Sequence, residues 1–273
     1  MSEPILPVPP PVPFEKRRFR SAAAHYRTGR PAYAALLFAR VAERIGLAQR
    51  HAVLDLGCGP GPLAIGFAPF AGSVTAIDPE PEMLRSAAAA AADCGMVIRF
   101  IEASSYDIGP AFGRFRLVTI GRAFHWMDRE ETLRRLDQMI EPGGAVALFR
   151  DRHLVVPDNA WHDAFDAVLE KFGGDDPVRT ERKSPNRPKH EAVLLDSPFC
   201  RLERIGVVER RHTPSAHFID RMLSFSSTSP QMIEGRVEAM VAELEAALAP
   251  YAENGIIAEV VESEALIAMR PGA

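Results

Sequence analysis

Several short stretches of this 273-residue chain contain residues that can hold and activate a small molecule. The clearest is VLDLGCGPG at residues 53–61, in which Gly57, Gly59 and Gly61 alternate with other residues. Glycines permit positive φ and let a ligand approach the backbone closely. A helix is predicted to begin directly after this loop, and its N-terminus favours an anionic group. The run therefore predicts a ligand-binding loop, and a glycine-rich turn without a ligand is the alternative.

Two aspartates belong to the same predicted site. Asp78 stands 17 residues past Gly61, where an acid in a doubly wound sheet lies beside the ribose of a bound nucleotide. A dinucleotide site would have the spacing G-x-G-x-x-G, but the spacing here is G-x-G-x-G. Asp55 precedes the loop, and a carboxylate there suits a cationic amine better than a pyrophosphate. These features favour S-adenosylmethionine, which has an amino-acid end, over a nicotinamide dinucleotide.

A cluster of bulky side chains at Arg122–Trp126 follows a run that predicts a buried strand at 115–120. His125 is a candidate general base, because histidine titrates near neutral pH. The alternative is a histidine that packs or hydrogen-bonds to shape a pocket. Phe124 and Trp126 either pack in the core or line the pocket.

Further side chains are predicted at the same edge of the sheet. Phe19, Tyr26 and Arg30 precede the first predicted strand and would form a lid that shields a reaction from water, unless Tyr26 and Arg30 only anchor the first helix. Arg150 and His153 follow the fifth predicted strand and are candidate substrate contacts. A surface or structural role is the alternative for His153.

Alternating strands and helices are needed to bring these residues together. Short apolar runs predict five strands, at 51–56, 73–78, 96–101, 115–120 and 145–149. Periodic apolar positions and caps predict helices at 31–45, 62–70, 80–94, 128–140, 160–172 and 233–248, and two further strands are predicted at 202–210 and 256–269. Pro142-Gly143-Gly144 predicts a turn before the fifth strand. The alternation indicates an α/β fold with a doubly wound, mostly parallel sheet and helices on both faces.

The predicted organisation is a disordered proline-rich tail at 1–14 and a single domain at 15–273. A proline-rich ligand for a partner domain is the alternative for the tail. The domain is divided into an N-terminal helical lid at 15–50, a cofactor-binding core at 51–150, a helical insertion that caps the substrate at 151–225, and a C-terminal helix and last strand at 226–273.

Composition narrows the class of partners. A net charge of −4 and a pI of about 6.1 leave no basic footprint for nucleic-acid binding. Three cysteines at unrelated spacings suit neither a disulfide framework nor a metal site, which fits a reducing cytoplasm. No apolar run reaches the roughly 18–20 residues that span a membrane. We expect a cytoplasmic protein with no metal, no membrane and no nucleic-acid partner; the sequence does not predict its oligomeric state.

Four stretches in order resemble the class I S-adenosylmethionine-dependent methyltransferases: VLDLGCGPG, AIDPEPEML, FRLVTIGRAFHWMD and IEPGGAVALF. The similarity is strongest to the small-molecule, methyltransferase type 11-like branch whose members carry an AFHW segment. It covers about residues 25–150, and HYRTGRPAYAALL at 25–37 resembles that branch's N-terminal segment. The resemblance implies a Rossmann-like methyltransferase fold and S-adenosylmethionine as cofactor, with S-adenosylhomocysteine as product.

The resemblance also implies roles for residues. In the family, glycines that match Gly57, Gly59 and Gly61 bind the methionine part, and the acid that matches Asp78 binds the ribose hydroxyls. The predicted cofactor-binding set is Asp55, Gly57, Cys58, Gly59, Gly61, Asp78, Pro79, Met83, Ser104, Ser105, Tyr106, Arg122 and Ala123. The predicted substrate-binding set is Tyr26, Arg30, Phe124, Trp126, Arg150 and His153, and the predicted catalytic residue is His125.

One segment departs from the family pattern. The family commonly has a small residue followed by an acid that together hold the adenine, whereas this chain reads EASSYDI at 102–108. Adenine recognition is expected from the Ser105 backbone, with Asp107 or a serine hydroxyl taking the exocyclic amine. The Asn/Asp-Pro-Pro-Tyr/Phe segment of the branch that methylates planar amines is replaced here by Arg122–His125.

The leading hypothesis is an enzyme that methylates an O, N or C nucleophile of a small organic acceptor by in-line displacement. Such an enzyme mainly positions the nucleophile and excludes water. The alternatives are a methyltransferase that acts on RNA or protein, a non-catalytic S-adenosylmethionine-binding protein, and a nicotinamide-dependent oxidoreductase. The sequence does not predict the acceptor itself.

Overall fold

A seven-stranded sheet with the strand order β3-β2-β1-β4-β5-β7-β6 runs through the described part of the chain. The computed structural model describes residues 19–173, 175–176, 180 and 184–272, so the predicted proline-rich tail at 1–14 lies outside the described residues. The strands are β1 (Ala52–Leu56), β2 (Ser73–Asp78), β3 (Arg99–Glu102), β4 (Phe115–Gly121), β5 (Ile140–His153), β6 (Arg201–Pro214) and β7 (Ile256–Met269).

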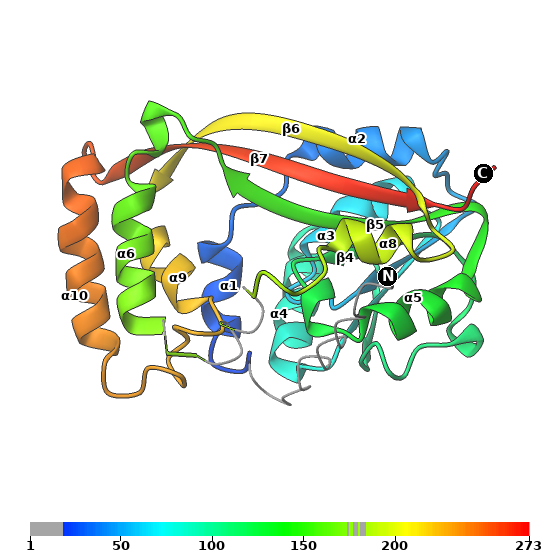
Figure 1. Cartoon of the computed structure of the whole chain (residues 1–273), viewed down its shortest axis with the longest axis horizontal. Coiled ribbons are helices and arrows are strands. Elements are labelled where there is room, and N and C mark those ends of the chain that lie inside the picture. The colour runs from blue at the N-terminus through cyan, green and yellow to red at the C-terminus, as the bar shows by residue number, and fades with distance from the viewer. Residues whose placement is uncertain (1–18, 174, 177–179, 181–183, 273) are drawn as a thin grey trace, which may run out of the picture.

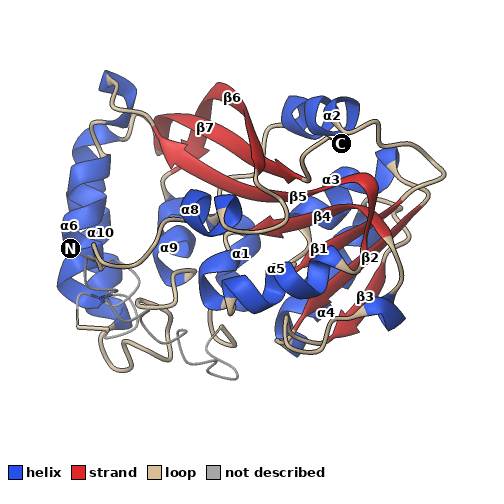
Figure 2. Ribbon diagram, turned by 45° about the vertical axis from the view of Figure 1, so that its right-hand side comes forward, coloured by secondary structure: helices blue, strands red, loops and turns tan. Residues whose placement is uncertain are grey.

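Strands β1 to β5 pair in parallel, while β7 pairs antiparallel with both β5 and β6. The chain builds β1, β2 and β3 in one direction and then returns to place β4 and β5 on the other side of β1. This reversal is the topological switch point at which open α/β sheets bind ligands. The predicted doubly wound, mostly parallel sheet is confirmed (Figure 2).

Helices cover both faces of the sheet because its strands alternate apolar side chains between two cores. Val53, Leu117 and Ala145 pack with α2 (Ala35–Arg44) and α3 (Pro62–Phe67) on one face. Their neighbours Leu54 and Val118 pack on the other face with α5 (Arg129–Asp137) and α8 (His190–Leu195). Helix α4 (Pro81–Asp93) contacts β2, β3 and α3. This period-two alternation is what a strand covered on both faces requires.

The helix predicted from Pro31 begins later, at Ala35. Arg30, the residue before the proline, has φ −81° and ψ 133°, because the proline ring disfavours helical geometry in the residue before it. Helix α1 (Ala23–Gly29) therefore ends at Gly29, and an extended segment separates it from α2. That segment passes the carboxyl edge of the sheet.

The predicted turn at Pro142-Gly143-Gly144 is a bulge inside β5 rather than a break before it. The register of β5 against β4 shifts between Phe115 and Leu117, and Gly143 takes a φ of +71° to absorb the extra residues. A side chain at Gly144 would lie 2.8 Å from the Arg116 carbonyl oxygen. Strand β5 therefore starts earlier and is longer than the sequence pattern indicated.

A helical lobe lies at one end of the molecule, where β5, β6 and β7 extend past the shorter strands (Figure 1). We define it as α6 (His162–Gly173), α9 (Ala216–Leu223) and α10 (Val237–Leu248). It has its own buried cluster, which includes Trp161, Phe165, Phe218, Met222, Met240 and Leu244. Residues 151–225 thus contain α6, α8 and α9, as a helical cap would, and also β6, which belongs to the main sheet.

Helix α1 joins this lobe to the sheet. His25 Nδ1 lies 2.7 Å from Asp220 Oδ1 on α9, and the Arg221 Nε donates to the Gly29 carbonyl oxygen at 2.9 Å. The two helices cross so closely that a Cβ on Gly29 would lie 2.3 Å from the Arg221 backbone nitrogen. The N-terminal segment is therefore held against the lobe beside the sheet edge.

Candidate active site

The glycine loop between β1 and α3 is built from left-handed backbone positions. Gly57, Gly59 and Gly61 have φ values of +69°, +54° and +79°, which side chains rarely adopt. The Gly57 and Cys58 N–H groups donate to the Ile77 carbonyl oxygen at 2.8 and 3.0 Å, which ties the loop to β2. A Cβ on Gly57 would lie 2.7 Å from the Ala123 side chain, so the loop also fits closely against the end of β4.

Asp78 connects the loop to the end of β2. Its two carboxylate oxygens accept hydrogen bonds from the Gly59 N–H at 2.8 Å and the Glu80 N–H at 2.9 Å. Burial raises the pKa of Asp78 to about 6, although both backbone hydrogen bonds favour the ionised form. The side chain lines the cavity described below. Each carboxylate oxygen has a second lone pair, so Asp78 retains capacity to accept bonds from ribose hydroxyls.

Asp55 lies below the loop and does not line the cavity. Its carboxylate accepts from the Ala64 N–H at 3.0 Å and the Thr119 hydroxyl at 2.9 Å. Burial raises its pKa to about 7. In this position the carboxylate links the first turn of α3 to β4 by hydrogen bonds, and it stabilises the base of the glycine loop.

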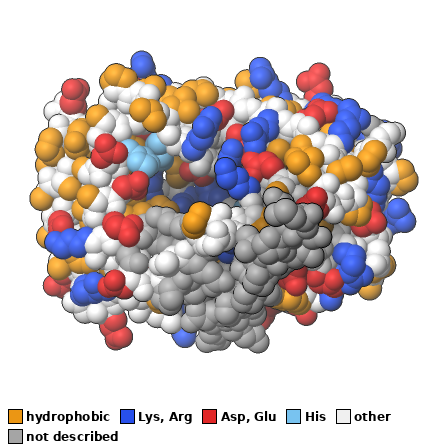
Figure 3. Space-filling view, in the orientation of Figure 1, with side chains coloured by type: hydrophobic (Ala, Val, Ile, Leu, Met, Phe, Trp, Pro, Cys, Tyr) orange, Lys and Arg blue, Asp and Glu red, His pale blue; other side chains and the backbone are white. Residues whose placement is uncertain are grey.

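A cavity of about 830 Å³ opens at the carboxyl edge of the sheet, between the sheet and the helical lobe. Figure 3 shows it as a hollow in the face of the molecule, with Lys and Arg side chains inside and a histidine at the rim. Its volume falls in the range of about 300–1,000 Å³ found for small-molecule sites. The predicted site residues that line it are Tyr26, Arg30, Gly57, Gly59, Asp78, Met83, Arg122, Ala123, Phe124, His125, Trp126, Arg150 and His153.

The remaining predicted residues are not part of the cavity wall, and they are Asp55, Cys58, Gly61, Pro79, Ser104, Ser105 and Tyr106. Cys58 and Gly61 belong to the loop but face the core: Cys58 is buried, and a Cβ on Gly61 would meet Ala87 of α4. The Ser104 N–H and hydroxyl both donate to Asp107 at 2.8 and 2.6 Å. The predicted adenine segment therefore closes on itself as a side-chain-capped turn.

The AFHW segment forms a single 3₁₀ turn, η3 (Phe124–Trp126), directly after β4. Phe124 is buried and also contacts the cavity, so core packing and pocket lining both apply to it. The Trp126 ring packs edge-on against Phe19 with centroids 5.2 Å apart, and the His125 ring lies 5.1 Å from Trp126. The N-terminal segment thus reaches the turn that carries His125, as a lid would.

His190 packs over the same turn. Its ring lies 5.1 Å from Phe124 and is nearly parallel to His125 at 6.4 Å. Burial lowers the pKa of His190 to about 4, so the ring is neutral at neutral pH. Arg187, from the same segment, donates to the His125 carbonyl oxygen at 2.9 Å. This segment therefore packs against the turn that carries His125.

Arg122 joins three parts of the site. Its φ is +53°, a left-handed value that is rare outside glycine. The guanidinium forms an ion pair with Asp151 on β5, donates to the Pro31 carbonyl oxygen at 2.8 Å, and lies over the Tyr33 ring. Arg122 therefore fixes the extended segment after α1 to the ends of β4 and β5.

Asp151 stays ionised beside Arg122. Burial alone would raise its pKa, but the guanidinium groups of Arg122 and Arg30 together lower it. Arg30 itself is held between aromatic rings, 5.2 Å from the Tyr26 centroid and 3.9 Å from the Phe225 centroid. Burial lowers the pKa of Arg30, although a guanidinium remains charged in proteins.

His153 and Arg150 are already paired within the protein. His153 Nε2 lies 2.8 Å from Glu259, which also pairs with Arg221 at 2.9 Å. Arg150 pairs with Glu264 at 2.9 Å and is half exposed. The structural alternative for His153 fits these contacts, since the network joins β5 and β7 to α9.

Sequence patterns did not indicate several other residues of the cavity wall, among them His190, Arg221, Phe225 and Ser226. His190 ends the polar stretch at 173–190, and the other three belong to α9 or to the segment after it, regions with no motif. A lone histidine at 190, directly before an apolar run, was the only sign available. In the part of the chain that the structure describes, no group of three or more His, Cys, Asp or Glu side chains is placed to hold a metal ion. No described helix is long and apolar enough to cross a membrane.

Comparison with known proteins indicates the class of enzyme that this chain resembles. The model of a family described as a methyltransferase domain matches residues 53–144. A methyltransferase of Mycobacterium tuberculosis, itself uncharacterised, is 26% identical over 231 residues, which is 83% of this chain and 84% of that protein. A malonyl-[acyl-carrier protein] O-methyltransferase of Pseudescherichia vulneris is 34% identical over 134 residues, which is 49% of each chain.

The fold also matches solved structures. A SAM-dependent methyltransferase from Thiobacillus denitrificans, crystallised with S-adenosyl-L-homocysteine, superposes with a TM-score of 0.52 at 15% identity, over 93% of this chain and 98% of that one. The matched domain, the relatives and the fold place this chain among the class I S-adenosylmethionine-dependent methyltransferases. Its cofactor is S-adenosylmethionine.

Proposed function

We propose that the protein transfers a methyl group from S-adenosylmethionine to an O, N or C nucleophile of a small organic acceptor, as members of the AFHW-bearing branch do. The observation that supports this most is one shared cavity. The glycine loop and Asp78 line one side of it, while His125 and Trp126 line another. A ligand held by the loop would therefore meet its acceptor inside a walled space.

The residues of the cofactor half suit S-adenosylmethionine. The backbone at Gly59 faces the cavity, where an added Cβ would come within 4.0 Å only of the Met83 sulfur, so a ligand has room against the loop. We assign the amino-acid end to the loop and the ribose hydroxyls to Asp78. The bound cofactor supplies a methyl group already activated by its sulfonium charge.

The acceptor half would orient the nucleophile and exclude water. Phe19 and Trp126 are in edge-on contact across the mouth of this half, and His190 packs over the AFHW turn. We assign His125 the role of taking the proton from a hydroxyl, ammonium or C–H acceptor as the new bond to the methyl carbon forms. The similarity to an O-methyltransferase supports an oxygen nucleophile among these.

The proposal is tested by binding and by methyl transfer. Calorimetry with purified protein is expected to show S-adenosylhomocysteine bound at one site per chain, and Asp78→Ala is expected to weaken it by about tenfold or more, since hydrogen bonds to a charged group contribute about 1.5–3 kcal/mol. Incubation with methyl-labelled S-adenosylmethionine and a small-molecule extract is expected to label an acceptor below the size of a peptide. Absence of S-adenosylhomocysteine binding by the wild-type protein would remove the proposal.

A matched control separates ligand loss from general damage. Asp93→Ala removes an exposed carboxylate from the end of α4, outside the cavity wall. It is expected to leave S-adenosylhomocysteine affinity within about threefold of the wild-type value, below one hydrogen bond's contribution. Equal losses for Asp78→Ala and Asp93→Ala would show that Asp78 has no particular role at the ribose.

A further inference from the structure

Among the residues that the structure describes, five arginines line the cavity, and four of them are paired with carboxylates. Arg122 pairs with Asp151, Arg150 with Glu264, Arg152 with Glu262 and Arg221 with Glu259. Arg30 is the exception, because it forms no ion pair with any residue that the structure describes. Asp151 lies close enough for its charge to interact with that of Arg30, but it pairs directly with Arg122. Arg30 therefore lacks the direct carboxylate partner that the other four arginines have, and a partly buried cation without such a contact is costly.

The hydrogen-bond donors of Arg30 are also only partly used. One Nη donates to the Ser224 carbonyl oxygen at 3.2 Å, whereas Nε is buried and has no hydrogen-bond partner among the described residues. Tyr26 and Phe225 hold the guanidinium between their rings, which fixes its plane without satisfying its N–H groups. The guanidinium therefore lines the cavity in a fixed plane, and protein groups use only part of its hydrogen-bonding capacity.

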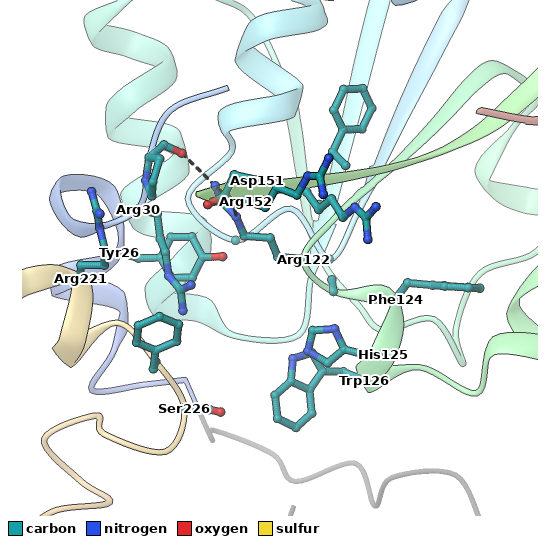
Figure 4. Close-up of a pocket in the computed structure, with 18 of the residues that line it drawn as sticks. Tyr26, Arg30, Arg122, Phe124, His125, Trp126, Asp151, Arg152, Arg221 and Ser226 are labelled. Carbon is teal, nitrogen blue, oxygen red and sulfur yellow. Dashed lines mark hydrogen bonds and ion pairs between the residues drawn. The ribbon is translucent and has the colours of Figure 1, made fainter. Parts of the chain in front are cut away.

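Two hydroxyl groups of the cavity wall form no hydrogen bond to a described residue, those of Tyr26 and Ser226. Both side chains line the cavity, and Ser226 is buried. Figure 4 shows Tyr26, Arg30 and Ser226 on one side of the cavity, facing His125 and Trp126 on the other. A guanidinium and two hydroxyls supply several donors and one net positive charge, which a carboxylate complements with its acceptor oxygens and negative charge.

We infer that Tyr26, Arg30 and Ser226 form a carboxylate-binding subsite, so that the methyl acceptor is an organic acid. The inference rests on the proposed function, because it names the substrate class of that same cavity. Ser226 and the Phe225 ring come from the segment after α9, on the lobe side, and not from the strands that carry the glycine loop. The other source of a carboxylate is the amino-acid end of the cofactor itself.

The first experiment separates these two sources. S-adenosylhomocysteine and 5′-methylthioadenosine share the nucleoside, but only the former has an amino-acid carboxylate. Calorimetry on the wild type and Arg30→Gln is expected to give S-adenosylhomocysteine affinities within about threefold of each other, since a lost charge-assisted bond would cost more. A loss of about tenfold or more for S-adenosylhomocysteine alone, with methylthioadenosine unchanged, would assign the subsite to the cofactor and overturn the inference.

The second experiment probes the acceptor side directly. Benzoate and its neutral isostere benzamide are titrated by ligand-observed NMR into protein saturated with S-adenosylhomocysteine. Arg30→Gln is expected to weaken benzoate by about tenfold or more and benzamide by less than about twofold. Arg152→Gln is the matched control, because it removes the same charge from the same cavity but from an arginine already paired with Glu262. It is expected to leave both probes within about twofold.

Conservative variants keep the test informative if Arg30→Gln fails to fold. Tyr26→Phe and Ser226→Ala each remove one hydroxyl and are expected to weaken benzoate by about fivefold. No benzoate binding by the wild type, or equal binding by the wild type and all three variants, would overturn the inference. Either result leaves the proposed function intact as long as S-adenosylhomocysteine still binds. Failure of the carboxylate subsite can therefore be distinguished from failure of the proposed function.

Discussion

At the scale of the residue, Asp78 serves the fold and the ligand at once. Its carboxylate accepts a hydrogen bond from the Gly59 N–H in the glycine loop and another from the Glu80 N–H, which precedes α4. Burial raises its pKa from 3.8 to about 6. Because the pKa is raised in the folded protein, the stability that Asp78 contributes is present below pH 3.8 and is lost as the pH rises through about 6. Ribose hydroxyls would offset that loss by donating to the ionised form.

The affinity for S-adenosylhomocysteine is therefore expected to depend on pH. Between about pH 5 and about pH 7.5 the carboxyl changes from mostly protonated to mostly ionised, and affinity should rise by up to about tenfold, since each pKa unit corresponds to about 1.4 kcal/mol. Calorimetry across this range measures it. Asp78→Asn is expected to bind more weakly and with a flat pH profile. A pH dependence that persists in Asp78→Asn would point to another titrating group.

His125 supports a second prediction at this scale. His125→Ala should leave S-adenosylhomocysteine affinity within a few-fold, because the side chain lies on the acceptor side of the cavity. Turnover should fall by about 10²–10⁴ if His125 is the base. Steady-state kinetics with the identified acceptor measures it. A fall much smaller than tenfold would leave His125 as part of the pocket wall.

Local spacing explains which site residues could be predicted from the sequence. Gly57, Gly59 and Asp78 lie within one strand–loop–helix–strand unit, so their positions followed from short-range pattern alone. Whether Asp55 faces the ligand or the core depended on Thr119, a strand away, which local pattern does not reveal. Ser226 was unpredictable for the same reason at longer range, because a lobe with no motif brings it to the cavity.

At the scale of the element, the crossing of α1 and α9 sets where the N-terminal segment lies. Gly29 permits that crossing, since a Cβ there would lie within 2.5 Å of α9 backbone atoms. Its own φ is ordinary for a helix, so the requirement is one of space. Arg30 and Tyr26 belong to this segment, and their position at the cavity follows from the crossing.

Gly29→Ala is therefore expected to push α1 away from α9. Overpacking of this kind costs about 1–3 kcal/mol, and acceptor affinity should fall together with the unfolding temperature. Gly109→Ala is the matched control, because Gly109 is extended and no atom lies within 4 Å of its added Cβ. Thermal unfolding measures both variants, and equal melting temperatures would show that the crossing can relax.

Strand and helix types were more predictable than their ends. The predicted last strand at 256–269 coincides with β7, because a long alternating run with flanking turn signals leaves little choice. The predictions of where α2 starts and of how β5 runs were wrong for opposite reasons. Pro31 constrains the residue before it, whereas Gly143 allows the strand to continue through a bulge. Single residues decide such boundaries, and periodicity averages over them.

At the scale of the whole molecule, β7 joins the main sheet to the helical lobe. It lies between β5 and β6, and it pairs with β6 along its whole length and with β5 over residues 261–269. Its fully buried residues Ala265 and Ile267 belong to the sheet core, whereas Ile257 belongs to the lobe core. The last strand in the sequence is thus an interior strand of the fold.

A chain ending at Gly255 is therefore expected to lose the cooperative unfolding transition, because β6 would have no strand to pair with. A chain ending at Arg270 retains β7 and the Arg270 contacts to Asp137, and its stability should stay within about 0.5 kcal/mol of the full chain, as for changes away from structural features. Circular dichroism and denaturant titration measure both. A cooperative transition in the shorter chain would show that the parallel strands and their helices fold without β7.

The length of β5, β6 and β7 has a mechanical consequence. Each strand has 14 residues, against four to seven in the other strands, and β6 and β7 pair along all 14. The ribbon of β6 and β7 therefore spans about 46 Å at roughly 3.3 Å per residue. One end of the ribbon belongs to the main sheet, and α6, α9 and α10 lie at its other end (Figure 1). A flexure of about 5° halfway along, acting over the remaining 23 Å or so, would move the tip by about 2 Å. A movement of that size at the lobe would change how tightly the cavity between the sheet and the lobe encloses a bound molecule.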